Sequence, residues 1–422
     1  MTHFSARPDR RLIRANSRSH RFTLVEVTAP SATQQRERTP VNLAFVIDRS
    51  GSMSGGKLDL AKHAVEEALG RLDPRDRFSI VVYDDVVDVV VEGTTASAEA
   101  RRNAVERLAQ VDARGSTDLA GGWLRGCEQV SLHLSDAGVD RVLLLTDGLA
   151  NVGITDPTAL AGHAAELRAR GVSTTTFGVG NDFDESLLQA MADAGGGHFY
   201  YIADAAQIRD HIASEVGETL EVVARDVELE ILAGEGVEIE TISPHPLTGR
   251  GSRSIIALGD LVADQQIDVV LRLTFPYGQL GRETGIIIGI GDRDGAFKAA
   301  AVGDARISWT WADDAANDQQ RRDGDVDRAV ARQFAARARQ EAVRRNRDGD
   351  YRGARSALDG TAKRIRGYAA RDPKLRAMVG ALESESQQFS APMAPRLLKE
   401  AHFASANLAR SRDPMGRSVK GR

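Results

Sequence analysis

Between residues 41 and 220, short apolar runs alternate with stretches of helical spacing, and this alternation limits the possible folds more than any other feature of the chain. Runs of this length are typical of buried strands, and they read VNLAFVI, FSIVVY, VVDVVV, RVLLLT, VSTTTFGV and HFYYI. The helical spacing is clearest at Leu58, Ala61, Ala64, Val65, Ala68, Leu69 and Leu72. The pattern predicts an α/β fold built on a doubly wound sheet.

One connection in this region is too short to be a crossover helix. Only YDDVVD lies between the second and third apolar runs, so these two strands are expected to form a hairpin and make one edge of the sheet antiparallel. Asp84, Asp85 and Asp88 are expected to line the hairpin turn.

The pattern changes after residue 220 to strands without intervening helices. The runs are DVELEILA, VEIETI, RSIIALG, QIDVVLRLTF, TGIIIGI and DARISWTW, and they predict a small β-sandwich over residues 221–312. Residues 1–40 contain RLIRAN and RFTLVEVTA, which are too few strands for a stable sheet. We therefore expect these N-terminal strands to complete the sandwich, with the domain of residues 41–220 inserted into it.

Residues 318–422 are predicted to form a helical, basic C-terminal region. RRNRDGD suits a tight turn between two helices, and the resulting hairpin resembles one tetratricopeptide-like unit. Residues 319–422 carry 24 Lys and Arg against 12 Asp and Glu, a balance of +12, whereas residues 1–318 carry 31 against 48, a balance of −17. We expect these helices to dock on acidic parts of the chain or to be solvated. A nucleic-acid binder that uses this tail is the alternative, and the sparse aromatic residues argue against it.

An imitation of a calcium loop begins at Asp323, Asp325 and Asp327. The sixth position is Arg328 where a calcium loop needs Gly, and the twelfth is Phe334 where it needs Glu. Helix capping is therefore the expected role of these aspartates.

Length and composition set the broad class of protein. The chain has 422 residues, enough for two to four domains at roughly 100–200 residues each. No apolar run approaches the roughly 18 residues of a membrane span. Cys127 is the single cysteine, which fits a reducing compartment. We expect a soluble, cytoplasmic protein.

Residues 44–60, AFVIDRSGSMSGGKLDL, can be interpreted as either of two sites. Gly51 to Lys57 spell G-x-x-x-x-G-K, which suggests a P-loop-like nucleotide-hydrolysing enzyme. That motif needs Ser or Thr next, and Leu58 is there instead. Asp48 would also place a carboxylate where phosphates approach. RVLLLTD could serve as the aspartate strand of such an ATPase, so the enzyme remains an alternative.

A metal site explains more of the same residues. Asp48, Ser50 and Ser52 spell D-x-S-x-S, and in an extended loop this spacing turns all three side chains to one side. Thr117 in ARGSTDLAGG and Asp147 in LLLTDG follow other elements and can complete the set at the carboxyl edge of the sheet, where doubly wound folds bind ligands. No H-E-x-x-H or G-x-S-x-G motif is present. The sequence therefore favours a binding protein and not an enzyme.

DRSGSM, GSTDLAGG and LLLTDG, in this order and spacing, resemble the three loops of a von Willebrand factor A (VWA) domain with its metal-ion-dependent adhesion site (MIDAS). The stretch TFGVGNDFDESLLQAMADAGGGHFYYI is also similar to that family, so the resemblance covers residues 41–220 and implies a Rossmann-like fold. The family often has GGT where this chain has GST, but Thr117 is kept. The wider arrangement resembles bacterial relatives of the inter-alpha-trypsin inhibitor heavy chains and of the calcium-activated chloride channel regulators.

The resemblance also implies roles for the five candidate metal residues. Ser50 and Ser52 are expected to bind the cation directly, and Thr117 to bind it when a ligand is engaged. Asp48 and Asp147 are expected to act mainly through water or through the other ligands. Two carboxylates balance the charge of a divalent ion, and Mg²⁺ (or Mn²⁺) keeps one coordination position for an outside oxygen.

The outside oxygen is expected to be an Asp or Glu carboxylate of a protein partner. The chain would then be a magnesium-dependent scaffold or adaptor in the cytoplasm. A common partner of similar bacterial proteins is an AAA+ ATPase of the MoxR type. Lys57 meets no phosphate in this interpretation, so its substitution is expected to do little.

Overall fold

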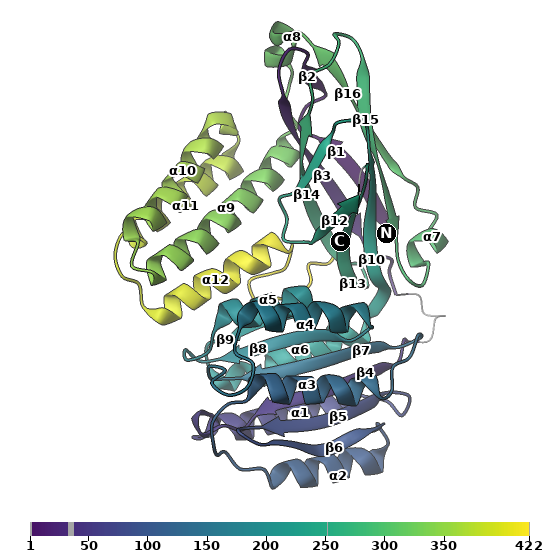
Figure 1. The fold of residues 1–422 in the computed structure, drawn as a ribbon, viewed down its shortest axis with the longest axis vertical. Helices are drawn as coiled ribbons and strands as arrows, with labels where there is room; N and C mark the ends of the chain where they lie inside the picture. The colour runs from purple at the N-terminus through teal and green to yellow at the C-terminus, as the bar shows by residue number, and fades with distance from the viewer. Residues whose placement is uncertain (1, 33–37, 251, 422) are drawn as a thin grey trace. The chain divides into compact units, whose positions relative to one another are not determined.

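The structure is a computed structural model that describes residues 2–32, 38–250 and 252–421 (Figure 1). The chain divides into two compact units. One unit comprises Gln34–Val222, and the other comprises Met1–Thr33 together with Val223–Arg422. Across the described ranges, none of the helices has the length and apolar character needed to span a membrane.

The Gln34–Val222 unit is built on a six-stranded sheet of order β6-β5-β4-β7-β8-β9. Its strands are β4 (Val41–Asp48), β5 (Arg77–Tyr83), β6 (Val87–Thr95), β7 (Val139–Thr146), β8 (Ser173–Val179) and β9 (Gly196–Ile202). β5 and β6 pair antiparallel, whereas the other neighbours are parallel. The α/β prediction and the predicted antiparallel edge are confirmed.

Helices cover both faces of this sheet. They are α1 (Lys57–Gly70), α2 (Ala98–Ala109), α3 (Leu119–Ser131), α4 (Pro157–Ala169), α5 (Glu185–Ala194) and α6 (Ile208–Leu220), with short 3₁₀ turns η1 (Gly51–Met53) and η2 (Ala205–Gln207). Figure 1 shows α3, α4 and α5 on one face and α1 and α6 on the other. Every residue of β4 and β7 is buried, which explains why these strands read as continuous apolar runs.

The second unit contains two sheets. The first has four strands in the order β1-β3-β14-β11, namely β1 (His3–Pro8), β3 (Ser19–Thr28), β11 (Glu238–Thr241) and β14 (Gln266–Phe275). The second has the order β12-β13-β10-β15-β16-β2 and comprises β2 (Leu12–Arg14), β10 (Val222–Ala233), β12 (Leu247–Arg250), β13 (Arg253–Val262), β15 (Glu283–Gly291) and β16 (Ala305–Ala312). β3 pairs antiparallel with β14 along its whole length, and β2 pairs parallel with β16.

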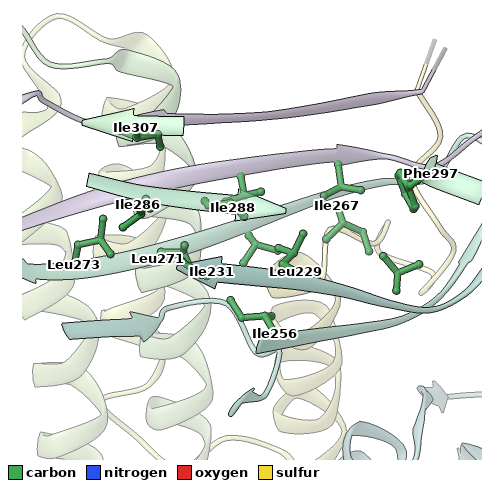
Figure 2. Close-up of a cluster of buried hydrophobic side chains, with 14 of the residues drawn as sticks. Leu229, Ile231, Ile256, Ile267, Leu271, Leu273, Ile286, Ile288, Phe297 and Ile307 are labelled. Atoms are coloured by element: carbon green, nitrogen blue, oxygen red, sulfur yellow. The ribbon is translucent and has the colours of Figure 1, made fainter. Parts of the chain in front are cut away.

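Both sheets contribute to one hydrophobic cluster. Figure 2 shows members from β10, β13, β14, β15 and β16, among them Ile231, Ile256, Leu271, Ile288 and Ile307. Alternate residues of β10 and β14 point into this cluster, as expected for strands with one face on a core. The N-terminal strands therefore share a core with strands beyond residue 222.

The chain ends in helices that pack on the four-stranded sheet and on one another. They are α9 (Gly324–Arg347), α10 (Tyr351–Ala369), α11 (Pro373–Gln388) and α12 (Pro395–Ala409), preceded by the short α7 (Ala296–Ala299) and α8 (Asp314–Gln319). Val326, Ala329 and Val330 of α9 pack against Leu24 of β3 and Val270 of β14. This contact covers the face of that sheet opposite the shared core.

The sequence predicted the helical C-terminal region and two of its local features. Gly349 adopts a φ of 78° between α9 and α10, which confirms the tight turn in RRNRDGD. The Asp323 side chain accepts hydrogen bonds from the N–H groups of Asp325 and Val326, which confirms helix capping. Many basic side chains are engaged by acidic ones in the same unit, as in Arg328–Asp372, Arg332–Asp268 and Arg339–Glu385.

Two strands and two short helices were not expected from the sequence. β1 and β12 have weak strand patterns, because HFSARP ends in proline and LTGR contains glycine. Each is a strand through its pairing with β3 or β13. α7 and α8 are too short for a periodic signal.

Candidate metal site

The five candidate metal residues come from four loops or strand ends of the Gln34–Val222 unit. Asp48 is the last residue of β4, and Asp147 directly follows β7. β4 and β7 are neighbours, with Ile47 opposite Leu145, so the two carboxylates leave the sheet side by side. Ser50 and Ser52 lie before α1, and Thr117 lies before α3.

Ser50, Ser52 and Asp147 converge through direct contacts. The Oγ atoms of Ser50 and Ser52 are 3.0 Å apart. Ser52 Oγ donates a hydrogen bond of 2.5 Å to Asp147 Oδ1. Ser50 and Asp147 are 2% and 1% exposed, whereas Ser52 lies at the surface. The three side chains therefore form a group of oxygen atoms that is open on the Ser52 side.

Asp48 is held inside the protein by two hydrogen bonds. Its Oδ1 accepts from Ser50 N at 2.7 Å, and its Oδ2 accepts from Thr146 Oγ1 at 2.6 Å. Burial raises the pKa of Asp48 above its ordinary value and the Asp147 charge adds to the rise, whereas the hydrogen bonds from Thr146 and Ser50 lower it. Both oxygens are engaged, so the geometry suits an indirect role in metal binding.

Thr117 is fixed by the loop that follows Asp147. Its N–H donates to Asn151 Oδ1 at 2.9 Å, and its carbonyl accepts from the N–H groups of Asn151 and Val152. A Cβ atom built on Gly148 would lie 3.5 Å from Thr117 Oγ1 and 3.6 Å from Ser52 Oγ. The two hydroxyls therefore flank Gly148, and an added methyl group there would be in ordinary van der Waals contact with both.

A partly buried cluster of ion pairs beside the site was missed by sequence reasoning. Arg49 Nη2 lies 2.5 Å from Asp88 Oδ2, and Arg114 Nε donates to Asp84 Oδ2 at 2.8 Å. Asp84 also contacts Arg49 and is 0% exposed. Burial acts to raise the pKa of Asp84, but hydrogen bonds from Arg114, Val86 N and Arg49 outweigh it and leave this pKa below its ordinary value.

Asp84 thus does more than line a hairpin turn. Its backbone carbonyl accepts from Asp118 N at 2.8 Å, so it also holds the loop that carries Thr117. The available signal was Arg49 itself, because an arginine beside a metal motif needs a carboxylate partner once it is buried, as Arg49 is.

Lys57 also contacts the site, which sequence reasoning did not anticipate. Its Nζ lies 2.5 Å from Asp147 Oδ2 and donates to the Ser52 carbonyl at 3.2 Å. Sequence reasoning considered Lys57 only as a phosphate ligand. Lys57 lies five residues after Ser52 in the chain, and no sequence pattern indicated that its side chain would reach Asp147.

The residues present fit a hard divalent cation. The donors are hydroxyl and carboxylate oxygens, which Mg²⁺ and Mn²⁺ prefer. Neighbouring ligands of an octahedral ion with bonds of about 2.1 Å lie about 3 Å apart, which matches the 3.0 Å between the Ser50 and Ser52 hydroxyls. A nucleotide loop needs a hydroxyl side chain at position 58. Leu58 stands there instead, is 4% exposed and packs in the core.

Another group of possible ligands is better explained as a structural network. His198, Glu215 and Glu218 bring ligand atoms within 4.8 Å of one another. The Glu215 carboxylate binds Arg141 Nη1 at 2.7 Å and accepts from Tyr200 Oη at 2.8 Å. Since the arginine already supplies the positive charge, this group is a buried ion pair.

Comparisons with known proteins point to one domain family. The family model of the von Willebrand factor type A domain matches residues 42–214. The protein YfbK of Escherichia coli is 33% identical over 212 residues, which are 50% of this chain and 36% of YfbK. The bovine inter-alpha-trypsin inhibitor heavy chain H1 is 31% identical over 238 residues, 54% of this chain and 26% of that protein. The chain thus spans less than half of either relative.

A solved structure resembles nearly the whole fold. The von Willebrand factor type A protein from Catenulispora acidiphila aligns with a TM-score of 0.68 and 18% identity, covering 96% of this chain and 90% of that one. At this identity the match concerns the fold alone. It extends the likeness beyond the α/β unit to the sheets and helices of the second unit.

Proposed function

Residues 42–214 form a von Willebrand factor type A domain, and we propose that this chain uses it as a magnesium-dependent protein-interaction module. Domains of this family are generally metal-dependent interaction modules, and their relatives are mostly adhesion or scaffold proteins. The observation that carries the proposal is the convergence of Ser50, Ser52 and Asp147 at the carboxyl edge of the sheet.

Each of the five residues has a distinct role in the proposed site. Ser50 and Ser52 are the direct ligands, because their hydroxyls lie at the spacing of neighbouring ligands. Asp147 accepts a hydrogen bond from the Ser52 hydroxyl and thereby orients the lone pairs of that hydroxyl toward the ion. Asp48 holds the loop through Ser50 N. Thr117, beside Gly148, is the hydroxyl that joins when a partner is bound.

The bound ion supplies positive charge to an oxygen from outside the chain. An Asp or Glu carboxylate of a partner is the natural ligand, because it is a hard, charged oxygen donor. An AAA+ ATPase of the MoxR type is our candidate partner, on the likeness to bacterial proteins of this kind. The proposed setting is the cytoplasm. The single cysteine, Cys127, is free and is compatible with a reducing compartment.

Metal binding is tested by titration calorimetry with MgCl₂ and MnCl₂. We expect the wild type to bind one ion and Ser52→Ala to bind it at least about tenfold more weakly. Ser54→Ala is the matched control, since Ser54 is exposed in the same loop and its side chain has no described hydrogen bond. Equal binding by the wild type and Ser52→Ala, or binding by neither, would contradict the assignment.

Partner binding is tested separately with Thr117→Val. This change removes a neutral hydroxyl while the Thr117 N–H can still donate to Asn151. We expect Mg²⁺ binding to persist and recovery of the partner, in pull-downs compared with and without chelator, to fall several-fold. Partner recovery that ignores both the chelator and this substitution would exclude the metal-carboxylate contact.

A further inference from the structure

Lys57, the first residue of α1, places a positive charge directly on the candidate metal site. Its Nζ lies 2.5 Å from Asp147 Oδ2 and 3.2 Å from the Ser52 carbonyl oxygen. The Asp147 side chain is 0% exposed, whereas that of Lys57 keeps 32% of its surface. Since Asp147 Oδ1 accepts from Ser52, the ammonium group engages the remaining oxygen of this carboxylate.

Four of the other charges near the site are paired with one another. Arg49 and Arg114 pair with Asp84 and Asp88, two positive charges with two negative ones. The Asp118 carboxylate accepts from Gly121 N at the N-terminus of α3, where the helix dipole favours a negative charge. The charged side chains in direct contact with the Ser50–Ser52 loop and with one another at the site are Asp48, Asp147 and Lys57.

We propose that Lys57 is a specificity-determining residue that makes this metal site require an anionic ligand, an inference that rests on the proposed function. Two carboxylates and one ammonium group leave the site with one negative charge, so a bound divalent ion keeps one positive charge. A neutral oxygen from a backbone or an amide leaves that charge in place. A partner's carboxylate cancels it.

The same count explains what Lys57 does in the wild-type site. Without this lysine, the two carboxylates alone neutralise the ion, and an outside carboxylate gains less. With Lys57 present, its ammonium group repels the ion, so the ion by itself binds more weakly. An anion offsets this repulsion with its negative charge, so the ion binds more strongly when an anion is bound as well. Metal binding and partner binding are thereby coupled.

The test is a calorimetric titration with MnCl₂ in two buffers of equal ionic strength, one of sodium perchlorate and one of sodium acetate. Acetate is the probe for a partner's carboxylate, and perchlorate coordinates metals weakly. In perchlorate we expect Lys57→Met to bind Mn²⁺ about tenfold more tightly than the wild type, because one nearby positive charge is removed. In acetate the wild-type affinity should rise several-fold, while that of Lys57→Met should change little.

Lys62→Met is the matched control, because Lys62 lies on the same helix and pairs with Asp59 at 3.3 Å, away from the site residues. It should behave like the wild type in both buffers. Lys57→Gln, which keeps a polar group at the same position, serves as a second variant, and thermal unfolding verifies that each variant is folded.

The outcomes separate the two proposals. If folded Lys57→Met and Lys57→Gln bind Mn²⁺ no more tightly than the wild type, or keep the wild-type response to acetate, the role of Lys57 is wrong while the metal site stands. If Ser52→Ala binds Mn²⁺ as the wild type does, or if no variant binds it, the metal site itself is wrong and the inference fails with it.

Discussion

Individual side chains of the candidate site hold one another in position through direct contacts. Asp147 binds Ser52 through one oxygen and Lys57 through the other. Asp48 joins the loop after β4 to Thr146 at the end of β7. Such contacts fix the hydroxyl oxygens before they are used, which reduces the conformational entropy lost when an ion binds.

Leu58 separates a metal loop from a nucleotide loop. Leu58→Ser completes the G-x-x-x-x-G-K-S pattern, yet we expect no gain of ATP binding. Because Leu58 is 4% exposed, the change should lower the free energy of unfolding by about 2–4 kcal/mol through the lost burial and the buried hydroxyl. Urea unfolding and binding of a fluorescent ATP analogue measure the two effects.

Leu60→Ser is the control for this prediction. Leu60 lies on the same helix but is 37% exposed, so its substitution should cost less than about 1 kcal/mol. ATP binding by Leu58→Ser, but not by Leu60→Ser, would support the nucleotide interpretation instead.

Cys127 provides a chemical probe of the same domain. It is 1% exposed on α3, and burial raises the pKa of its thiol well above the ordinary value. The reactive thiolate is therefore scarce in the folded protein at pH 8, and iodoacetamide should label Cys127 orders of magnitude more slowly than in denaturant. Mass spectrometry over time measures this, and rapid labelling of the native protein would show that α3 is not packed as described.

At the scale of elements, three connecting loops beside the site are linked to one another. The loop after β4 carries Arg49, the turn after β5 carries Asp84, and the loop before α3 carries Arg114. Arg114 N donates to the Arg49 carbonyl at 2.8 Å, and Gly51 N donates to the Gly115 carbonyl at 3.1 Å. A displacement of any of these loops therefore moves Thr117 relative to Ser50 and Ser52.

Gly115→Ala tests this coupling between loops. Gly115 has a φ of 69°, and a Cβ there would lie 2.0 Å from Asp85 Oδ1, which accepts from Ser116 N. We expect a loss of about 1–3 kcal/mol in the free energy of unfolding and weaker Mn²⁺ binding, because both the strain and the clash act on the loop that carries Thr117.

Gly180→Ala is the matched control for backbone strain. Its φ is 75°, but nothing lies within 4 Å of the added Cβ. It should lose about 1 kcal/mol of stability and keep the wild-type affinity for Mn²⁺. If both variants bind Mn²⁺ like the wild type, the position of the Thr117 loop does not matter for the metal.

At the scale of the whole molecule, the chain leaves one unit and returns to it. β3 lies between β1 and β14 in the four-stranded sheet, and its register with β14 runs from Ser19 opposite Phe275 to Thr28 opposite Gln266. Val25 and Val27 of β3 belong to the shared core. The stability of residues 223–312 therefore depends on residues that precede the α/β unit in the sequence.

Removing residues 1–36 should expose this dependence. The deletion takes away an interior strand, so we expect residues 223–312 to become sensitive to protease while residues 41–220 stay resistant. Removing only residues 1–8 deletes β1, an edge strand, and should have a smaller effect. Limited proteolysis with mass spectrometry measures both, and a resistant 223–312 region in the longer deletion would show that the N-terminal strands are dispensable.

Much of the α/β unit could be predicted from the sequence by itself, for a local reason. β4 and β7 are buried on both faces, so their apolar runs stand out, and helical spacing marked α1. The candidate metal residues followed from the D-x-S-x-S spacing and from the rule that parallel strands end at one edge. The antiparallel β5–β6 edge followed from the length of one connection.

Only the tertiary structure decided which distant side chains meet. Lys57 and Asp147 are 90 residues apart in the chain, and Arg114 and Asp84 are 30 apart. β1 and β12 became strands through pairing, against weak patterns of their own. Periodicity reports which face of an element is buried, whereas a contact between loops depends on strand order, register and packing, which leave no periodic signal. The sequence by itself therefore determined most of the elements and the candidate ligands, and the fold decided the short, paired strands and the charges that surround those ligands.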